Sequence, residues 1–169
     1  MDNNNLMLNV NMNNLEEDER KQLMALIEKA NKPKSKIWKP SNSNKAYFYI
    51  TTSGNVSHGC WDGGQFDESR YEFGNCYPTK EDAEFAAEAH KVYAELKRYA
   101  EEHSDPIDWD NETCYKYSLH YNHYKKKIET TGHVTWQSIG IFFSSDQLAM
   151  QAVKEIGENR IKKYLFRVE

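Results

Sequence analysis

The segment Phe73-Gly-Asn-Cys-Tyr-Pro-Thr-Lys-Glu-Asp-Ala83 leads from a short aromatic strand, through a capped turn, into an alanine-rich helix. A second segment, Ile139-Gly-Ile-Phe-Phe-Ser-Ser-Asp-Gln-Leu-Ala149, has the same order of residue types. The matched pairs are Gly74 with Gly140, Tyr77 with Phe143, Thr79 with Ser145 and Ala83 with Ala149. Neither segment carries a catalytic signature. The duplication therefore predicts a scaffold that binds a partner.

Around the first segment, the sequence predicts a hairpin, a third strand and a helix. Residues 46–52 are rich in aromatic and β-branched side chains, and a Ser-Gly-Asn turn separates them from a second strand at 56–61. Residues 71–77 predict the third strand. Thr79 is placed to cap a helix, with Asp82 three residues later as the acid of a capping box. This helix is expected to run to about His103, with small residues on the face that meets a sheet.

The second unit follows an acidic linker at 104–112. Residues 114–121 predict a strand whose odd positions from Tyr115 to Tyr121 form one apolar face. Strands at 125–130 and 134–143, a helix capped by Ser144 or Ser145, and a closing helix or turn at 158–168 complete the unit. The predicted fold class is α+β, with two tandem β-β-β-α units of antiparallel sheet, plus an N-terminal helix.

The predicted domain boundaries are 1–36 for an N-terminal arm and helix, 37–104 for the first unit and 105–169 for the second. In the asparagine-rich stretch 2–14, apolar residues alternate with polar ones from Leu6 to Met12, which fits an ordered strand-like arm, and a flexible tail is the other interpretation. Residues 15–30 have one apolar helical face. That helix is either a docking helix or an element that makes a homo-oligomer.

Composition narrows the classes of function. The chain has 169 residues, a net charge of −4 and a pI of about 5.9, which argues against non-specific binding to DNA. No apolar stretch is long enough to span a bilayer, and the N-terminus lacks a secretion signal. The three cysteines have no CxxC spacing, so we expect a reduced, cytoplasmic protein without a disulfide framework.

Several residue clusters contain catalytic or metal-binding residue types but lack the arrangement that such sites need. A metal site at 114–133 would need His120 and His123 on the same side, but a strand turns them to opposite faces. The pair His58 and Cys60 lacks an oriented base and an oxyanion hole, and residues 105–112 lack the regular ligand offsets of a calcium loop. Phosphate-binding glycine loops and nucleophile elbows are also absent from the sequence. We therefore expect no enzyme activity, metal or cofactor.

Aromatic side chains supply the predicted binding site. Exposed rings beside cations can stack a base and hold a phosphate, whereas the alternative interpretation is that these rings form the core. We expect Phe48 and Ile50 to face the core, which leaves Tyr47 and Tyr49 for a partner. The candidate binding residues are Trp38, Tyr47, Tyr49, Trp61, Arg70 and Tyr71.

Over residues 15–169, the pattern resembles small accessory proteins of phages and prophages of Gram-positive bacteria. The resemblance is carried by Trp38-x-Pro40, Tyr47-x-Tyr-Ile50, Gly54-x-Val56, Trp61, Arg70-Tyr71, Gly74-Asn75, Thr79-x-Glu81-x-Ala83, Ala94-Glu-Leu-Lys97 and Ile156-Gly-Glu-x-Arg160-Ile-Lys-Lys-Tyr-Leu-Phe166. It implies a product of a mobile element that acts in the host cell cytoplasm. Proteins of this kind often inhibit host defence by covering a nuclease or by sequestering a nucleotide signal.

Three functions from different classes follow. The preferred one is a non-catalytic phage-encoded binding protein that inhibits host defence by binding a host protein or a nucleotide-type small ligand. The first alternative is a module of phage replication or regulation that binds single-stranded nucleic acid, which the acidic pI disfavours. The second alternative is a structural or assembly protein.

Overall fold

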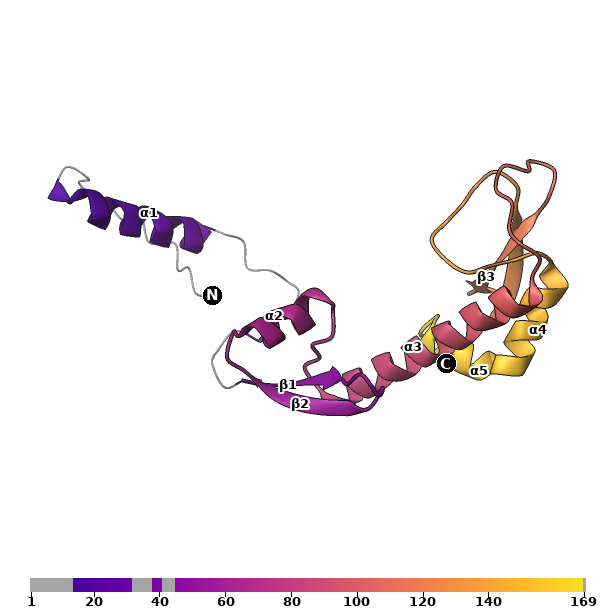
Figure 1. Ribbon diagram of the computed structural model, residues 1–169, viewed down its shortest axis with the longest axis horizontal. Coiled ribbons are helices and arrows are strands. Elements are labelled where there is room, and N and C mark those ends of the chain that lie inside the picture. The colour runs from indigo at the N-terminus through magenta and orange to yellow at the C-terminus, as the bar shows by residue number, and fades with distance from the viewer. Residues whose placement is uncertain (1–13, 32–37, 41–44, 169) are drawn as a thin grey trace. The chain divides into compact units, whose positions relative to one another are not determined.

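The computed structural model describes residues 14–31, 38–40 and 45–168, and it divides the chain into an N-terminal unit (1–38) and a larger unit (39–169) (Figure 1). The described residues confirm an α+β fold with small antiparallel sheets. The expected arm at 2–14 lies almost entirely outside the described residues. The helices are α1 Glu17–Asn31, α2 Gln65–Glu72, α3 Lys80–His103, α4 Asp146–Ile156 and α5 Glu158–Tyr164, and the strands are β1 Lys45–Ile50, β2 Val56–Trp61, β3 Lys116–Asn122, β4 Lys127–His133 and β5 Phe142–Phe143.

The helix expected at 15–30 is confirmed as α1. Three acidic residues fill its first turn, where the partial positive charge of the helix end favours them. The carboxylate of Glu19 also accepts a hydrogen bond from the backbone N–H of Glu16 at 2.9 Å, which satisfies a donor at the helix start. Met24, Leu26 and Ile27 are exposed on this helix.

The predicted hairpin is confirmed as β1 paired with β2, from Lys45 opposite Trp61 to Ile50 opposite Val56. The third strand predicted at 71–77 is reduced to a single bridge at Tyr77, because the chain forms the helix α2 up to Glu72. Acidic residues in the first turn of α2 and Arg70 in its last turn suit a helix. The sequence does not predict α2, because so short a segment has little apolar periodicity.

A single residue stands where the third strand was expected. Tyr77 exchanges two backbone hydrogen bonds of 2.9 Å with Phe48 of β1. Two residues earlier, the side-chain amide of Asn75 accepts from the N–H of Ile50 and donates to its C=O, each at 2.8 Å. The amide therefore occupies the next pairing position along the edge of β1, where a backbone peptide would otherwise bond.

The caps of the two central helices agree with the sequence. The Thr79 hydroxyl accepts from the N–H of Asp82 at the start of α3, and the Ser145 hydroxyl accepts from the N–H of Leu148 at the start of α4. In the second sheet the strand order is β4-β3-β5, with Tyr117 opposite Phe143. The long third strand predicted at 134–143 is limited to the two residues of β5.

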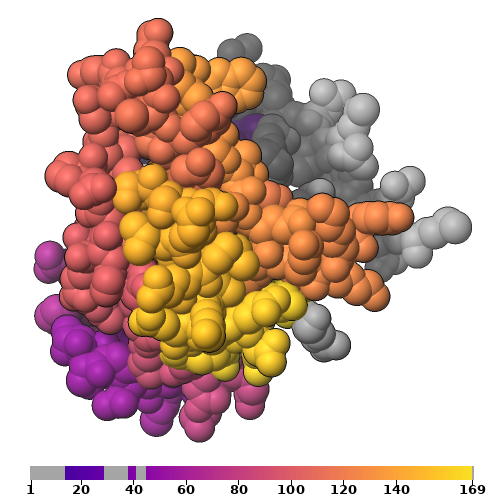
Figure 2. All heavy atoms as spheres, turned by 90° about the vertical axis from the view of Figure 1, so that its right-hand side faces the viewer, coloured from indigo at the N-terminus to yellow at the C-terminus, as the bar shows by residue number. Residues whose placement is uncertain are grey.

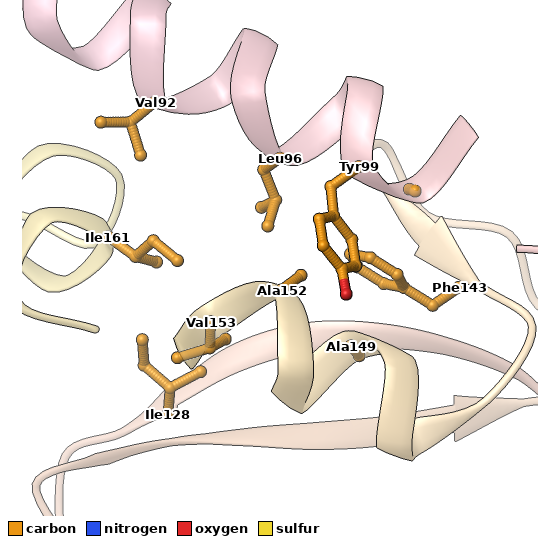
Figure 3. Close-up of a cluster of buried hydrophobic side chains, with 10 residues drawn as sticks. Val92, Leu96, Tyr99, Ile128, Phe143, Ala149, Ala152, Val153 and Ile161 are labelled. Carbon is orange, nitrogen blue, oxygen red and sulfur yellow. The ribbon is translucent and has the colours of Figure 1, made fainter. Parts of the chain in front are cut away.

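One apolar core lies between α3, α4, α5 and the second sheet (Figure 3). Val92, Leu96 and Tyr99 project from α3 toward residues of α4 and α5, and Ile128 and Phe143 come from the sheet. The predicted apolar face of β3 is confirmed at Tyr117, Leu119 and Tyr121, which pack against this cluster. The alanines of α4 are fully buried, which lets the helix approach the sheet closely.

The helix α3 packs against elements at both ends of the larger unit. It contacts β1 and β2 and also α4 and α5, so the hairpin and the second sheet are connected through one helix. Figure 2 shows the C-terminal helices (yellow) between α3 and the orange strands of the second sheet. Within the described residues, no helix combines the length and apolar character that crossing a membrane requires.

Candidate functional site

One of the aromatic residues predicted to bind a partner, Tyr47, contacts a buried carboxylate. Asp67 of α2 is 6% exposed and accepts hydrogen bonds from the Tyr47 hydroxyl at 2.6 Å and from the backbone N–H of Asp62 at 2.8 Å. The Tyr47 hydroxyl in turn accepts from the Arg70 guanidinium at 2.7 Å. This chain of hydrogen bonds fastens α2 onto β1. No signal in the sequence points to Asp67, because it lies in a stretch between the second and third predicted strands for which no element was predicted.

The electrostatics of this network favour a neutral tyrosine beside an ionised aspartate. Burial, and then the hydrogen bond to Asp67, raise the pKa of Tyr47 to about 12. Burial acts to raise the pKa of Asp67, but the hydrogen bonds from Tyr47 and Asp62 outweigh it and leave that pKa below its ordinary value. The buried polar atoms of this network all have hydrogen-bond partners, so its role is structural.

The other predicted residues gather around the same network. The Arg70 guanidinium lies 3.8 Å from the ring centroid of Tyr49. Trp61 packs edge-on against Tyr47 and against Tyr71, with ring centroids 6.0 and 6.4 Å apart. The ammonium of Lys39 lies 4.5 Å from the Tyr71 ring centroid and pairs with Glu68 at 2.7 Å.

The expectation that the Tyr47 face is free is wrong, because α2 covers it. Tyr47 is fully buried and Trp61 is 6% exposed, while Tyr49, Arg70 and Tyr71 are half-buried. Trp38 is half-buried and falls in the N-terminal unit. The structure therefore brings five of the six residues together, and two of those five have no surface to offer a partner. A binding role for the others stays a prediction.

A shallow groove with an acidic edge lies at the C-terminal half of α3, and we call it the acidic groove. It has a volume of about 420 Å³. Tyr93 and Glu101 come from α3, Asp105 and Trp109 from the segment that follows, and Ile141 from the segment before β5. Lys97 of the groove already pairs with Glu101 at 3.1 Å. The acidic groove therefore offers rings and aliphatic groups beside carboxylates.

The segment predicted as a linker forms one wall of the acidic groove. Trp109 packs edge-on against Phe142 with ring centroids 4.8 Å apart. Lys116 at the start of β3 is 2% exposed, and its ammonium donates to the carbonyls of Asn111 and Val134 at 2.5 and 3.0 Å. A buried ammonium needs such partners, so Lys116 holds the linker and the segment after β4 together.

Large apolar side chains are exposed beside the acidic groove. Ile139 is fully exposed, and its neighbours Gly140 and Ile141 line the groove. Tyr93 is 47% exposed and also lines a smaller apolar pocket that includes Ile139. Trp136, on the same segment between β4 and β5, is 79% exposed. Exposed apolar side chains that lie together mark interaction surfaces, and Tyr93 and Ile139 line the same pocket.

The outer face of the second sheet carries hydroxyl and imidazole groups. The Ser118 hydroxyl and Nε2 of His133 are 3.0 Å apart, which is the distance of a nucleophile from its base. The other described contact of the His133 ring is with the edge of Phe142, and among the described residues no carboxylate orients it. The pair therefore lacks the third group of a triad. The absence of catalysis remains a prediction.

The histidines considered as metal ligands are directed apart. His120 contacts the Thr131 hydroxyl at 2.9 Å, whereas His123 packs edge-on against Tyr121. No group of three or more potential ligands is found in the parts of the chain that the structure describes. Cys60 and Cys114 are exposed, and Cys76 is partly buried.

Comparison with protein-family models, with curated proteins and with solved structures gives no match for this chain.

Proposed function

We propose that this protein is a non-catalytic binding protein and that the acidic groove is the surface through which it binds a partner protein. The observation that carries the proposal is the fully exposed Ile139 beside a groove edged by Glu101 and Asp105. An apolar centre with a charged rim is the usual composition of a specific interface. The partner that fits it presents an apolar side chain flanked by lysine or arginine.

The partner class follows from the charge of the groove and of the chain. The segment after α3 continues with Asp108, Asp110 and Glu112, all exposed, and the chain as a whole carries a net charge of −4. A basic protein is attracted to such a surface from a distance, which raises the rate of association. The resemblance to phage accessory proteins supports the further proposal that the partner is a host defence protein, bound and inhibited in the cytoplasm of the host.

The finer fold prediction, two tandem β-β-β-α units, is also retained as a proposal. The pairing of Tyr77 with Phe48 and of Phe143 with Tyr117 supports it, because each capped helix then follows a short strand beside the first strand of a hairpin. The two caps, Thr79 and Ser145, support the same correspondence.

The proposed interface is tested by charge insertion at an exposed apolar position. Ile139→Asp places a carboxylate in the apolar centre, and Phe66→Asp, at an 81% exposed position on α2, makes the same change elsewhere. Each variant and the wild type is used to capture proteins from a Gram-positive host lysate, and the retained protein is then purified for affinity measurement. We expect Ile139→Asp to weaken binding about tenfold or more, and Phe66→Asp to leave it unchanged.

The inhibitory role is tested in cells with the same pair. Expression of the wild type and of Phe66→Asp should raise the plating efficiency of a phage on a host that restricts it, while Ile139→Asp should not. Unchanged capture and plating by Ile139→Asp would contradict the acidic groove as the interface. Capture of single-stranded nucleic acid by the wild type would favour the first alternative function, and a homo-oligomer without a host partner would favour the second.

A further inference from the structure

A second groove lies between the N-terminal half of α3 and the C-terminal segment that consists of α5 and the residues after it. Its volume is about 860 Å³, within the range of small-molecule sites. Tyr77 and Phe85 line one side, and Lys162, Lys163 and Arg167 line the other. It shares no lining residue with the acidic groove. We call it the basic groove.

Two of the three cations are available to a ligand. Lys162 pairs with Glu158 at 2.6 Å and is mostly buried. Lys163 and Arg167 are exposed, and their described contacts are with rings: the Lys163 ammonium is 5.2 Å from the Tyr164 centroid, and the Arg167 guanidinium carbon is 5.7 Å from that of Phe85. Neither is within ion-pair distance of a carboxylate among the described residues.

An acidic residue of the basic groove is already engaged. The Asp82 carboxylate accepts a hydrogen bond from the Thr79 hydroxyl at 2.7 Å as part of the α3 cap. Among the described residues, the groove therefore has two unpaired cations, Lys163 and Arg167, and one carboxylate, Asp82, which is hydrogen-bonded to Thr79. Its net charge is positive, although the chain as a whole is acidic. An anion is therefore the complementary ligand.

The backbone at Arg167 is unusual. Its φ is +54°, a left-handed conformation that non-glycine residues seldom adopt, and Val168 next to it donates to the carbonyl of Lys162 at 3.0 Å. This conformation turns the chain back after α5, and the Arg167 guanidinium lies over Phe85. Strained residues of this kind concentrate at ligand sites.

We propose that the basic groove binds a nucleotide, with the phosphate held by Lys163 and Arg167 and the base packed against the rings of Tyr77 and Phe85. An arginine fork suits phosphate oxygens, and a base stacks favourably on an aromatic side chain. The phosphate and base come either from a free nucleotide or from one nucleotide of a single strand, because both sources present the same chemistry to the groove.

The experiment uses the full chain and three probes: a fluorescent methylanthraniloyl derivative of ATP, a fluorescein-labelled oligothymidylate, and pyrophosphate as a competitor without a base. Arg167→Gly removes the guanidinium at a position whose backbone favours glycine, so the fold should be retained or slightly stabilised. Lys126→Gly is the matched control, because Lys126 is also exposed, cationic and left-handed, with a φ of +53°, but lies in the β3–β4 turn. Circular dichroism melting verifies both folds.

We expect Arg167→Gly to weaken nucleotide binding about tenfold or more and Lys126→Gly to leave it unchanged within the error of the measurement. Tighter binding of the ATP derivative identifies a free nucleotide as the source, and tighter binding of the oligothymidylate identifies a single strand. Pyrophosphate should compete only weakly. Failure of both labelled probes to bind, equal affinities of the two glycine variants, or equal competition by pyrophosphate and ATP would each overturn the proposal. None of these outcomes depends on Ile139 or on the acidic groove.

Discussion

At the scale of single residues, Tyr47 and Asp67 show how a buried polar pair can fix a helix on a hairpin. The Tyr47 hydroxyl donates to Asp67 and accepts from Arg70, so each buried side-chain polar atom of the network has a partner. Burying a tyrosine hydroxyl or a carboxylate without such partners is costly. The residues that resemble a ligand-binding aromatic cluster therefore secure α2 on β1.

Tyr47→Phe tests that role. The change removes the hydroxyl from both hydrogen bonds and leaves the buried Asp67 with its backbone donor at Asp62 but without the tyrosine donor, so we expect a loss of about 1–3 kcal/mol in the free energy of unfolding. The measurement is urea denaturation followed by fluorescence at neutral pH. Tyr124→Phe, at a 95% exposed position, should have no measurable effect. Equal stability of the two variants would show that the network contributes nothing net.

The pH dependence has a definite sign. Because the folded-state pKa of Tyr47 is raised from 10.0 to about 12, its contribution to stability is complete below pH 10 and is lost as the pH rises toward 12. The free energy of unfolding of the wild type should therefore fall in this window, and Tyr47→Phe should show a smaller fall. Parallel curves for the two proteins would contradict the assignment.

The cysteines differ in reactivity for a related reason. Burial raises the pKa of the Cys76 thiol to about 11, whereas Cys60 and Cys114 are exposed. In a reaction of the native protein with Ellman's reagent at pH 8, we expect two fast thiols and one slow thiol. Cys76→Ser should remove only the slow phase, and loss of a fast phase instead would contradict this assignment.

At the scale of elements, single residues and side-chain hydrogen bonds stand where a longer strand was expected. Gly54, with a φ of +81°, supplies the left-handed turn of the first hairpin. The Asn75 amide and the single residue Tyr77 complete the edge of β1 in place of a strand. Each central helix starts at a hydroxyl cap that the sequence predicted, because a cap depends only on residues three positions apart.

Asn75→Leu tests the edge of β1. The substitution removes both side-chain hydrogen bonds to Ile50 and leaves its N–H and C=O without those partners. We expect a loss of about 1–3 kcal/mol in the free energy of unfolding, measured by urea denaturation. Asn55→Leu, at an exposed turn position, should change it by no more than about 0.5 kcal/mol. Faster amide exchange at Ile50 in the first variant would locate the effect.

At the scale of the larger unit, α3 connects two packed regions. Its first half lies on the hairpin, with Ala83 and Ala87 buried, and its second half supplies Val92, Leu96 and Tyr99 to the main core. The Arg160 guanidinium of α5 also pairs with the Glu95 carboxylate of α3 through two contacts of 2.8 and 3.1 Å. Both grooves have one wall on this helix, so its stability determines their geometry.

Leu96→Ala tests whether the two regions unfold together. Removing a buried leucine side chain from the main core should cost about 2–5 kcal/mol, from lost burial and from the cavity that remains. If α3 couples the regions, the opening free energy measured by amide exchange should fall by the same amount in β1 as in β3. Unchanged protection of β1 would show that the hairpin region is a separate folding unit.

The sequence by itself determined the local features: the α+β class, the hairpin, the helix boundaries near 79–103 and the two caps, because these depend on residues a few positions apart. It also selected six candidate binding residues, of which four (Tyr49, Trp61, Arg70 and Tyr71) gather around a fifth, Tyr47. Only the tertiary structure decided which faces are covered, because α2 folds over Tyr47 and the predicted linker packs through Trp109 against Phe142. The exposed surfaces at Ile139 and Arg167 follow from that packing, which joins residues far apart in the chain and leaves no local pattern in the sequence.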